Sequence, residues 1–380
     1  MKQAILLTNL LLLFIFTGCV SKGNVKGKEL EVNTVVIPLP EDVLFLPGYL
    51  QNMTQPFLFH ENKKDYMLVY NHKIHALDLF NITDKKVEQI TLEREGPNGI
   101  TSPRSIAYFK GRFLVGTMSD KYYLVNRKGE VMSTHTLPSF SSIYAKEYNR
   151  MKSPGIIMNL FTFHAFNPES GEVAIVFYPT EMNESPVKRP YIIVVYSLET
   201  EKIEEIEIPY SKEFSSKTKW GILNDLNICF HQDLLILNNP ASSNIYTYNR
   251  KTKEYMVHSV PSSYVDNKIT LTERPSEEEN AFPNKGFYYP VQYDSFRNIY
   301  WRVQAGPAER PTSFDRIFSI SQISTDFNTH KEVKLPDERE ETHSILLIGK
   351  DNLYLNYAFE MADEELWLFE IPLKSFDRNK

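Results

Sequence analysis

A short strand–turn–strand pattern, Leu77-Asp78-Leu79-Phe80-Asn81-Ile82-Thr83-Asp84-Lys85-Lys86-Val87, decides the fold of this chain. Apolar residues stand on both sides of a polar turn of Asn, Asp and Lys. This predicts two antiparallel strands whose turn reverses the chain at the solvent edge. The same pattern returns at 123–131, 195–203 and 246–255. Recurrence of one hairpin along a chain indicates a repeat architecture.

Each hairpin belongs to a longer unit that begins with a strand-like apolar run. The first runs start at Pro56, Arg104, Leu160, Leu226, Tyr289 and Ser344. Successive starts lie about 50 to 65 residues apart, which leaves room for four strands and their loops. Six such units closed in a ring form a six-bladed β-propeller, so the sequence predicts this all-β fold. A single β-sandwich is the alternative, but about two dozen strands are too many for it.

The last unit, Ser344 to Phe376, has room for only three clear strands. A further strand-like segment, Val32 to Pro38, stands alone at the start of the folded body. We therefore expect this N-terminal strand to pair as the outer strand of the last blade, which would close the ring and protect a sheet edge. The best helix candidate is the short segment Ser141 to Met151.

The first nineteen residues have the composition of a targeting segment. Met1 and Lys2 lead into an apolar run, Ile5 to Phe16, that ends at Thr17-Gly18-Cys19. These features are typical of a secretory signal, and the run is too short to span a membrane. The small pair before Cys19 resembles the bacterial lipobox, whose Cys is diacylated and becomes the first residue of the mature protein. An ordinary secretory signal with a chance Cys is the alternative.

These observations divide the chain into three parts: a lipoprotein signal peptide at 1–18, a flexible tether at 19–30 after acylated Cys19, and a single propeller domain at 31–380. The tether is polar and rich in Gly and Lys, as a flexible linker should be. The formal net charge of -6 provides no basic stripe for nucleic acid and no polybasic patch for a membrane surface. The acyl chains on Cys19 would therefore provide the membrane anchor.

Three features together point to a family. The lipobox precedes a six-bladed pattern, the turn Glu95-Gly96-Pro97-Asn98-Gly99 follows the first unit, and Tyr289-Pro290-Val291-Gln292-Tyr293-Asp294 runs into Asn298-Ile299-Tyr300-Trp301-Arg302. In these features the chain resembles the Bacteroidetes lipoproteins of the domain of unknown function 4221 family and, more widely, the TolB-like six-bladed propellers. The resemblance covers nearly the whole chain. It implies the fold and a cell-envelope address, but no activity.

The residues after Cys19 indicate on which side of the membrane the protein lies. Val20-Ser21-Lys22-Gly23 lacks the acidic residues that surface export in this phylum tends to use directly after the Cys. We therefore expect an outer-membrane lipoprotein that faces the periplasm rather than the cell surface. We also expect a monomer.

The usual sequence signatures of catalysis and cofactor binding do not occur. The chain has no Gly-x-Ser-x-Gly elbow, phosphate-binding glycine loop, His-Glu-x-x-His zinc motif or EF-hand loop. The acidic run Glu277-Glu278-Glu279 lies in a long polar insertion, Asp266 to Lys285, where a solvated loop is a better interpretation than a calcium site. His72 and His75, three positions apart, lie on a predicted hairpin where we expect one of them to be exposed, so a metal site there is not expected. We therefore expect no cofactor and no metal.

Propeller geometry supplies a candidate site. Residues at or just before the start of each innermost strand line one mouth of the central channel, the funnel, where ligands of this architecture usually sit. The candidates at these positions are Arg104, His164, Asp225, Tyr289 and His343. A fixed cation, orienting hydrogen bonds from His164 and Asp225, and an amphipathic wall from Tyr289 would suit a carbohydrate, a peptide or an anionic small molecule. The alternative for each residue is a structural role, such as a turn cap or a pairing with a neighbouring blade.

Two function hypotheses remain open. In the first, the protein is a non-catalytic cell-envelope lipoprotein that binds a small molecule, a glycan or a partner protein through the funnel and loops. In the second, it is a propeller enzyme, a lyase or hydrolase that acts on a polysaccharide or a lactone. The second requires an acid–base pair or a metal at the channel. The absence of any catalytic motif favours the binding protein.

Overall fold

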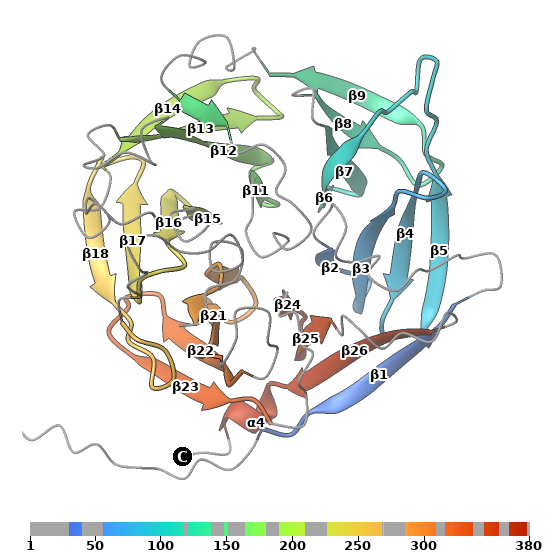
Figure 1. Cartoon of the computed structure of the whole chain (residues 1–380). Coiled ribbons are helices and arrows are strands. Elements are labelled where there is room, and N and C mark those ends of the chain that lie inside the picture. The colour runs from blue at the N-terminus through green and yellow to red at the C-terminus, as the bar shows by residue number, and fades with distance from the viewer. Residues whose placement is uncertain are drawn as a thin grey trace, which may run out of the picture.

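The computed structural model describes residues 30–39, 56–117, 121–137, 148–150, 164–179, 190–209, 226–267, 269, 286–308, 316–336, 346–356 and 365–377. Its strands form six antiparallel sheets that stand around a central axis (Figure 1). We number the sheets as blades 1 to 6 in chain order. The prediction of an all-β, six-bladed β-propeller is confirmed.

Each blade extends from its inner edge at the axis to an outer strand at the rim, and its strands follow in that order. Blade 1 contains β2 (Phe57–Glu61), β3 (Lys64–Asn71), β4 (Ala76–Asn81) and β5 (Lys86–Thr91), and blade 2 contains β6 (Pro103–Phe109), β7 (Arg112–Thr117), β8 (Lys121–Val125) and β9 (Val131–Thr136). Blade 3 contains β10 (Tyr148–Arg150), β11 (His164–Asn167), β12 (Glu172–Pro179), β13 (Tyr191–Ser197) and β14 (Ile203–Ile208), and blade 4 contains β15 (Asn227–His231), β16 (Leu234–Asn238), β17 (Asn244–Asn249) and β18 (Tyr255–Ser259). Blade 5 contains β19 (Phe287–Tyr288), β20 (Gln292–Asp294), β21 (Ile299–Ala305), β22 (Phe318–Ser324) and β23 (His330–Lys334), and blade 6 contains β24 (Leu346–Ile348), β25 (Asn352–Asn356), β26 (Glu365–Pro372) and β1 (Asn33–Pro38). A short helix, α4 (Lys374–Asp377), follows β26, and no helix in the described part of the chain has the length and hydropathy of a membrane span.

The N-terminal strand closes the ring, as predicted. β1 pairs antiparallel with β26 along its whole length, from Asn33 opposite Glu370 to Pro38 opposite Glu365. Blade 6 therefore holds both ends of the folded body, and its outer strand comes from the opposite end of the sequence (Figure 1). This pairing covers the edge of β26, which would otherwise expose unpaired backbone groups.

Hydrophobic clusters join each blade to the next. Within the described residues there are six such clusters, and each combines side chains from at least two neighbouring blades. The cluster between blades 6 and 1 includes Val35 and Ile37 of β1, which pack with Leu366 and Leu368 of β26 and with Met67 of β3. The core of this protein is therefore a ring of interfaces between sheets, and its closure depends on β1.

The inner edge of blade 3 differs from the prediction. Its inner strand was expected to start at Leu160, but Leu160 to Phe163 lie outside the described residues, and the described inner strand is β11. A second short strand that was not predicted, β10, pairs with the far end of β12. The predicted helix Ser141 to Met151 is wrong at Tyr148–Arg150, which are extended, and the rest of that segment lies outside the described residues. The pairing with β12 overrides the weak local preference for a helix.

The inner edge of blade 5 is interrupted at Tyr289-Pro290-Val291. The predicted continuous strand is divided into β19 and β20, because Pro290 has no N–H to donate to the sheet. At this break the side chain of Asn238, in blade 4, supplies hydrogen bonds to the backbone of blade 5. Its Nδ2 donates to the carbonyl of Tyr289 at 3.0 Å, and its Oδ1 accepts from the N–H of Val291 at 3.1 Å. One buried amide side chain thus replaces two hydrogen bonds that a strand would have made.

The connections of each blade alternate between two faces, because neighbouring strands are antiparallel. The turns from first to second strand and from third to fourth strand, such as 61–64 and 81–86, lie on what we call the turn face. The connections from second to third strand and from blade to blade, such as 71–76 and 92–102, lie on the loop face. The predicted funnel opens on the loop face.

Candidate functional site

The structure describes the side chains of two of the five predicted funnel residues. Arg104 lies in β6 of blade 2 and is half-buried, whereas Tyr289 lies between β19 and β20 of blade 5 and is only 4% exposed. Blades 2 and 5 are on opposite sides of the ring (Figure 1). The backbone of His164 begins β11, but its side chain, Asp225 and His343 lie outside the described residues. A common site of these five residues stays a prediction.

Tyr289 belongs to the core that joins blades 5 and 6. Its ring packs against Phe287, with the two ring centroids 4.9 Å apart. Any contact between this residue and a ligand would have to use the small part of its side chain that remains exposed.

Arg104 is near enough to Tyr70, which forms a buried pair with His75 in blade 1, to act on it electrostatically. The Tyr70 hydroxyl is 2.8 Å from Nδ1 of His75, and Nε2 of His75 is 3.2 Å from the carbonyl oxygen of Glu93. A neutral imidazole with its proton on Nε2 satisfies both contacts, because Nδ1 then accepts from the hydroxyl and Nε2 donates to the carbonyl. The pair thereby ties the end of β3 to the loop between β5 and β6.

The turn that carries His75 is shaped by Asn71. Its Oδ1 accepts from the N–H groups of Lys73 and Ile74 at 3.2 and 3.3 Å, and its Nδ2 donates to buried Asp78 at 2.9 Å. An Asn side chain that binds backbone N–H groups two and three residues ahead stabilises a tight turn. His75 itself has a φ of 60°, a left-handed conformation in which His is one of the better tolerated residues.

The loop between β5 and β6 carries a second cation, Arg94, which is exposed. The N–H of Leu92 donates to the carbonyl of His75 at 2.9 Å, so the loop starts against the His75 turn. Its tip turns at Gly96, whose φ of 87° favours glycine strongly. The predicted turn at 95–99 is therefore the element that presents Arg94 on the loop face.

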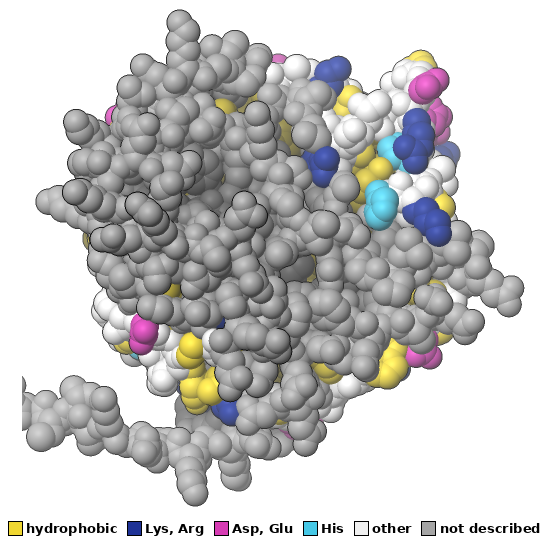
Figure 2. Space-filling view, viewed as in Figure 1, with side chains coloured by type: hydrophobic (Ala, Val, Ile, Leu, Met, Phe, Trp, Pro, Cys, Tyr) yellow, Lys and Arg dark blue, Asp and Glu magenta, His cyan; other side chains and the backbone are white. Residues whose placement is uncertain are grey.

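The ionised groups around Tyr70 are positive. Burial raises the pKa of Tyr70, while the charges of Arg94 and Arg104 act in the opposite direction. Burial also lowers the pKa of His75, so this imidazole is neutral at pH 7. Figure 2 shows Lys, Arg and His side chains, with Asp or Glu side chains next to them, at the upper right of the view. We call the group of Tyr70, His75, Arg94 and Arg104 the loop-face site.

This arrangement is suited to an anionic group. Guanidinium groups bind carboxylate, sulfate or phosphate through charge-assisted hydrogen bonds. No group of three or more His, Cys, Asp or Glu side chains that could hold a metal occurs among the described residues. The sequence identified Arg104, the 95–99 turn and the His72/His75 spacing separately, but it contained no signal that blade 1 brings Tyr70 and His75 to β6.

A second acid–base pair lies on the turn face. Nδ1 of His60 is 2.8 Å from Asp65, and the Tyr354 hydroxyl donates to the other carboxylate oxygen of Asp65 at 3.2 Å. Asp65 therefore links blade 1 to blade 6. The His60 ring also meets Phe296 edge-on, with centroids 5.7 Å apart. Because Phe296 belongs to blade 5, which is not a neighbour of blade 1, side chains narrow the channel at this end.

Comparisons with known proteins agree with this fold. A family model described as "Domain of unknown function (DUF4221)" matches residues 28–334. A crystal structure of a DUF4221 family member from Bacteroides vulgatus is similar, with a TM-score of 0.65, 17% identity, and coverage of 91% of this chain and 98% of that chain. A putative exported protein from Bacteroides fragilis has a TM-score of 0.49 and 12% identity, over 90% of this chain and 94% of that one. A luciferin-regenerating enzyme has a TM-score of 0.46 and 11% identity, over 90% and 96%. No curated protein matches the sequence.

Proposed function

Since the chain belongs to the family described as domain of unknown function 4221, whose description assigns no activity, we propose from the site itself that the protein is a non-catalytic lipoprotein of the cell envelope that binds an anionic small molecule or glycan. The observation that carries the proposal is the loop-face site, where the charges of Arg94 and Arg104 both act on Tyr70 of a buried Tyr–His pair. Its ligand would place a carboxylate or a similar anion between Arg94 and Arg104.

The surroundings of the two cations support binding. Arg94 is exposed on a loop that is held at its base, and Arg104 is half-buried on a strand. Side chains that are positioned before the ligand arrives lose less entropy on binding. Because His75 is neutral at pH 7, the charge of the site does not change through this imidazole near that pH.

Catalysis receives less support from the described residues. The enzyme hypothesis requires an acid–base pair at the channel. Two candidates for such a pair are Tyr70 with His75 and His60 with Asp65. Tyr70 and His75 are 7% and 2% exposed, and both ring nitrogens of His75 are occupied. Asp65 is 6% exposed and accepts hydrogen bonds from two blades. Both pairs are thus engaged in holding the fold together.

Arg104 provides the test of ligand binding. The variant Arg104→Met keeps the aliphatic stem but removes the charge, so its affinity for short oligogalacturonates, used as carboxylated probes, should fall by more than about tenfold. The free energy of unfolding should change by less than about 1 kcal/mol. Isothermal titration calorimetry and urea unfolding measure the two effects, with Arg112→Met as the exposed control. A loss of stability with unchanged affinity would assign Arg104 a purely structural role.

The membrane anchor is the second part of the proposal. Cys19 lies outside the described residues, and its role rests on the lipobox-like Thr17-Gly18-Cys19. We expect Cys19→Ser to abolish palmitate labelling and to leave an uncleaved or soluble precursor in place of a membrane-associated form. Labelling that survives this substitution would rule the anchor out. Protection of the protein from proteinase in intact cells would support the periplasmic face of the outer membrane.

A further inference from the structure

A polar cavity opens on the turn face between blades 3 and 4, away from the loop-face site. Its volume is about 540 Å³, within the range of small-molecule sites. The lining comes from the 167–172 turn and Glu204 of blade 3 and from residues 232–233 and 250–251 of blade 4. Every lining side chain is polar or charged, which is unusual for a site of this size and restricts the ligands that it suits.

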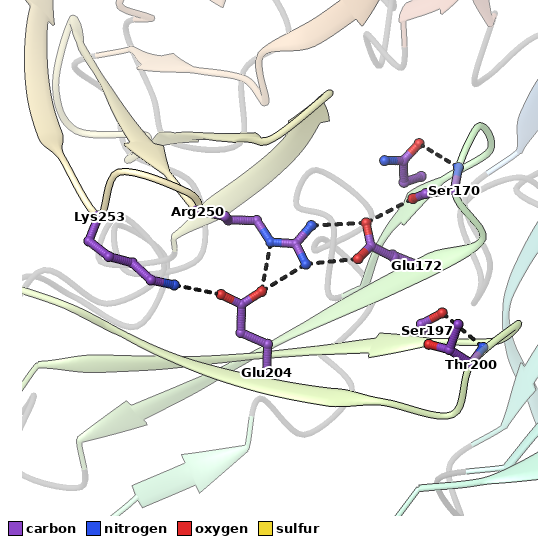
Figure 3. Close-up of polar contacts among 8 residues, drawn as sticks. Ser170, Glu172, Ser197, Thr200, Glu204, Arg250 and Lys253 are labelled. Carbon is purple, nitrogen blue, oxygen red and sulfur yellow. Dashed lines mark hydrogen bonds and ion pairs between the residues drawn. The ribbon is translucent and has the colours of Figure 1, made fainter.

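One wall of the cavity is a closed network of ions (Figure 3). The guanidinium of Arg250 donates to both carboxylate oxygens of Glu172 at 2.8 and 2.9 Å, and its Nε donates to Glu204 at 2.8 Å. Lys253 binds the other oxygen of Glu204 at 3.0 Å. Two cations therefore balance two carboxylates, and the side chains of Arg250 and Glu172 are only 16% exposed. The ion pairs hold the side chains of this wall in place. Because their charges cancel, the wall attracts neither an anion nor a cation through its net charge.

The amide of Asn167 provides evidence that the cavity binds a ligand. The residue is 5% exposed, and its Oδ1 accepts from the N–H groups of Glu169 and Ser170 at 3.0 and 3.4 Å. These bonds fix the orientation of the amide. No hydrogen bond within the described part of the chain uses its Nδ2, although Asn167 lines the cavity. This amide donor is therefore available to an acceptor in the cavity, which a ligand or water would supply.

Two more polar side chains, Glu169 and Gln232, line the cavity, and an aromatic pair lies near it without being part of its lining. No described cation lies within ion-pair distance of the Glu169 carboxylate, and the amide of Gln232 is exposed on the opposite side. Glu169 is near enough to act electrostatically on His231 and Tyr293. The rings of His231 and Tyr293 stack with their centroids 3.9 Å apart, and Tyr293 is half-exposed. An amphipathic ring therefore stands beside the polar groups.

We propose that this cavity is a second binding site, which takes a neutral, hydroxyl-rich ligand of the saccharide class. Hydroxyl groups donate to Glu169, accept from Nδ2 of Asn167 and do both with the amide of Gln232. Anions are disfavoured, because the wall that includes Lys253 is neutral, Lys251 is paired with Asp233, and the Glu169 carboxylate remains as the negative group of the lining.

The test is a titration of the mature protein with three neutral trisaccharides: maltotriose, cellotriose and xylotriose. We expect at least one of them to bind at millimolar concentration or below. Glu169→Ala and Gln232→Ala should each weaken that binding by about tenfold, because each removes hydrogen bonds to the sugar. Saturation-transfer NMR detects the binding, and calorimetry gives the dissociation constants.

Two controls separate this site from a loss of folding and from the loop-face site. Glu199→Ala removes an exposed carboxylate of the same blade outside the cavity and should leave the affinity unchanged. Arg104→Met should also leave it unchanged, whereas it weakens the binding of oligogalacturonates. Absence of binding by all three trisaccharides would overturn the proposal, as would binding that survives both Glu169→Ala and Gln232→Ala.

Discussion

A mature protein that begins at Pro40 will melt far below one that begins at Leu30, or will not fold at all. The shorter form lacks β1, and with it the whole ladder from Asn33 opposite Glu370 to Pro38 opposite Glu365. Removal of this strand opens the ring at the junction between blades 6 and 1. It also exposes a long edge of β26, which invites aggregation.

The size of the effect follows from burial. Val35 and Ile37 are 9% and 0% exposed, and their loss uncovers Leu366 and Leu368, which are both 0% exposed. Each such side chain contributes about 1.5–3 kcal/mol on burial, against a typical margin of about 5–15 kcal/mol. Differential scanning calorimetry of the two forms measures the difference. Equal melting temperatures would show that β1 is dispensable for closure.

Replacement of Arg302 by Ala will destabilise the protein more than any surface substitution. Arg302 is 0% exposed in β21 of blade 5, and its guanidinium donates to the carbonyls of Ser243 at 2.9 Å and Val260 at 2.6 Å, both in the segment of blade 4. It also lies over the ring of Tyr288, 4.4 Å from the centroid. Burial lowers the pKa of Arg302 to about 10, so the side chain remains charged at pH 7.

The cost of this substitution has two parts. Two buried carbonyls lose their donors, at about 1–3 kcal/mol each, and the deleted stem leaves a cavity. We expect the free energy of unfolding to fall by roughly 3 kcal/mol or more. Urea unfolding measures it, with Arg112→Ala as an exposed control that should change by less than about 0.5 kcal/mol. An unchanged midpoint for Arg302→Ala would mean that this contact does not hold blades 4 and 5 together.

Most of the fold was predictable, because short stretches of sequence specify its strands and turns. Hairpins such as 77–87 carry their own turn chemistry, and a lone strand at Val32–Pro38 next to a three-stranded last unit leaves one obvious pairing. The break at Pro290 was missed, because a continuous strand was predicted there although proline cannot donate to a sheet. By contrast, β10 has no strong local signal, and its strand conformation depends on pairing with β12.

The candidate sites depend on contacts between blades, which the sequence does not display. Arg104 was found from its position at the start of an inner strand, but Tyr70 and His75 belong to blade 1, where Tyr70 lies near the end of β3 and His75 lies in the turn that follows it. Likewise, Arg250 meets Glu172 across 78 positions of sequence, between blades 4 and 3. Spacing along one blade contains no information about such pairs, because the ring brings them together only after closure.

The central claim, that the loop-face site between blades 1 and 2 holds an anionic ligand, is tested most directly by a crystal structure of the protein soaked with an oligogalacturonate. We expect one carboxylate of the ligand within hydrogen-bond distance of both Arg94 and Arg104, with Tyr70 and His75 unchanged beneath it. A ligand bound elsewhere, or an empty site between these two arginines at saturating concentration, would contradict the account.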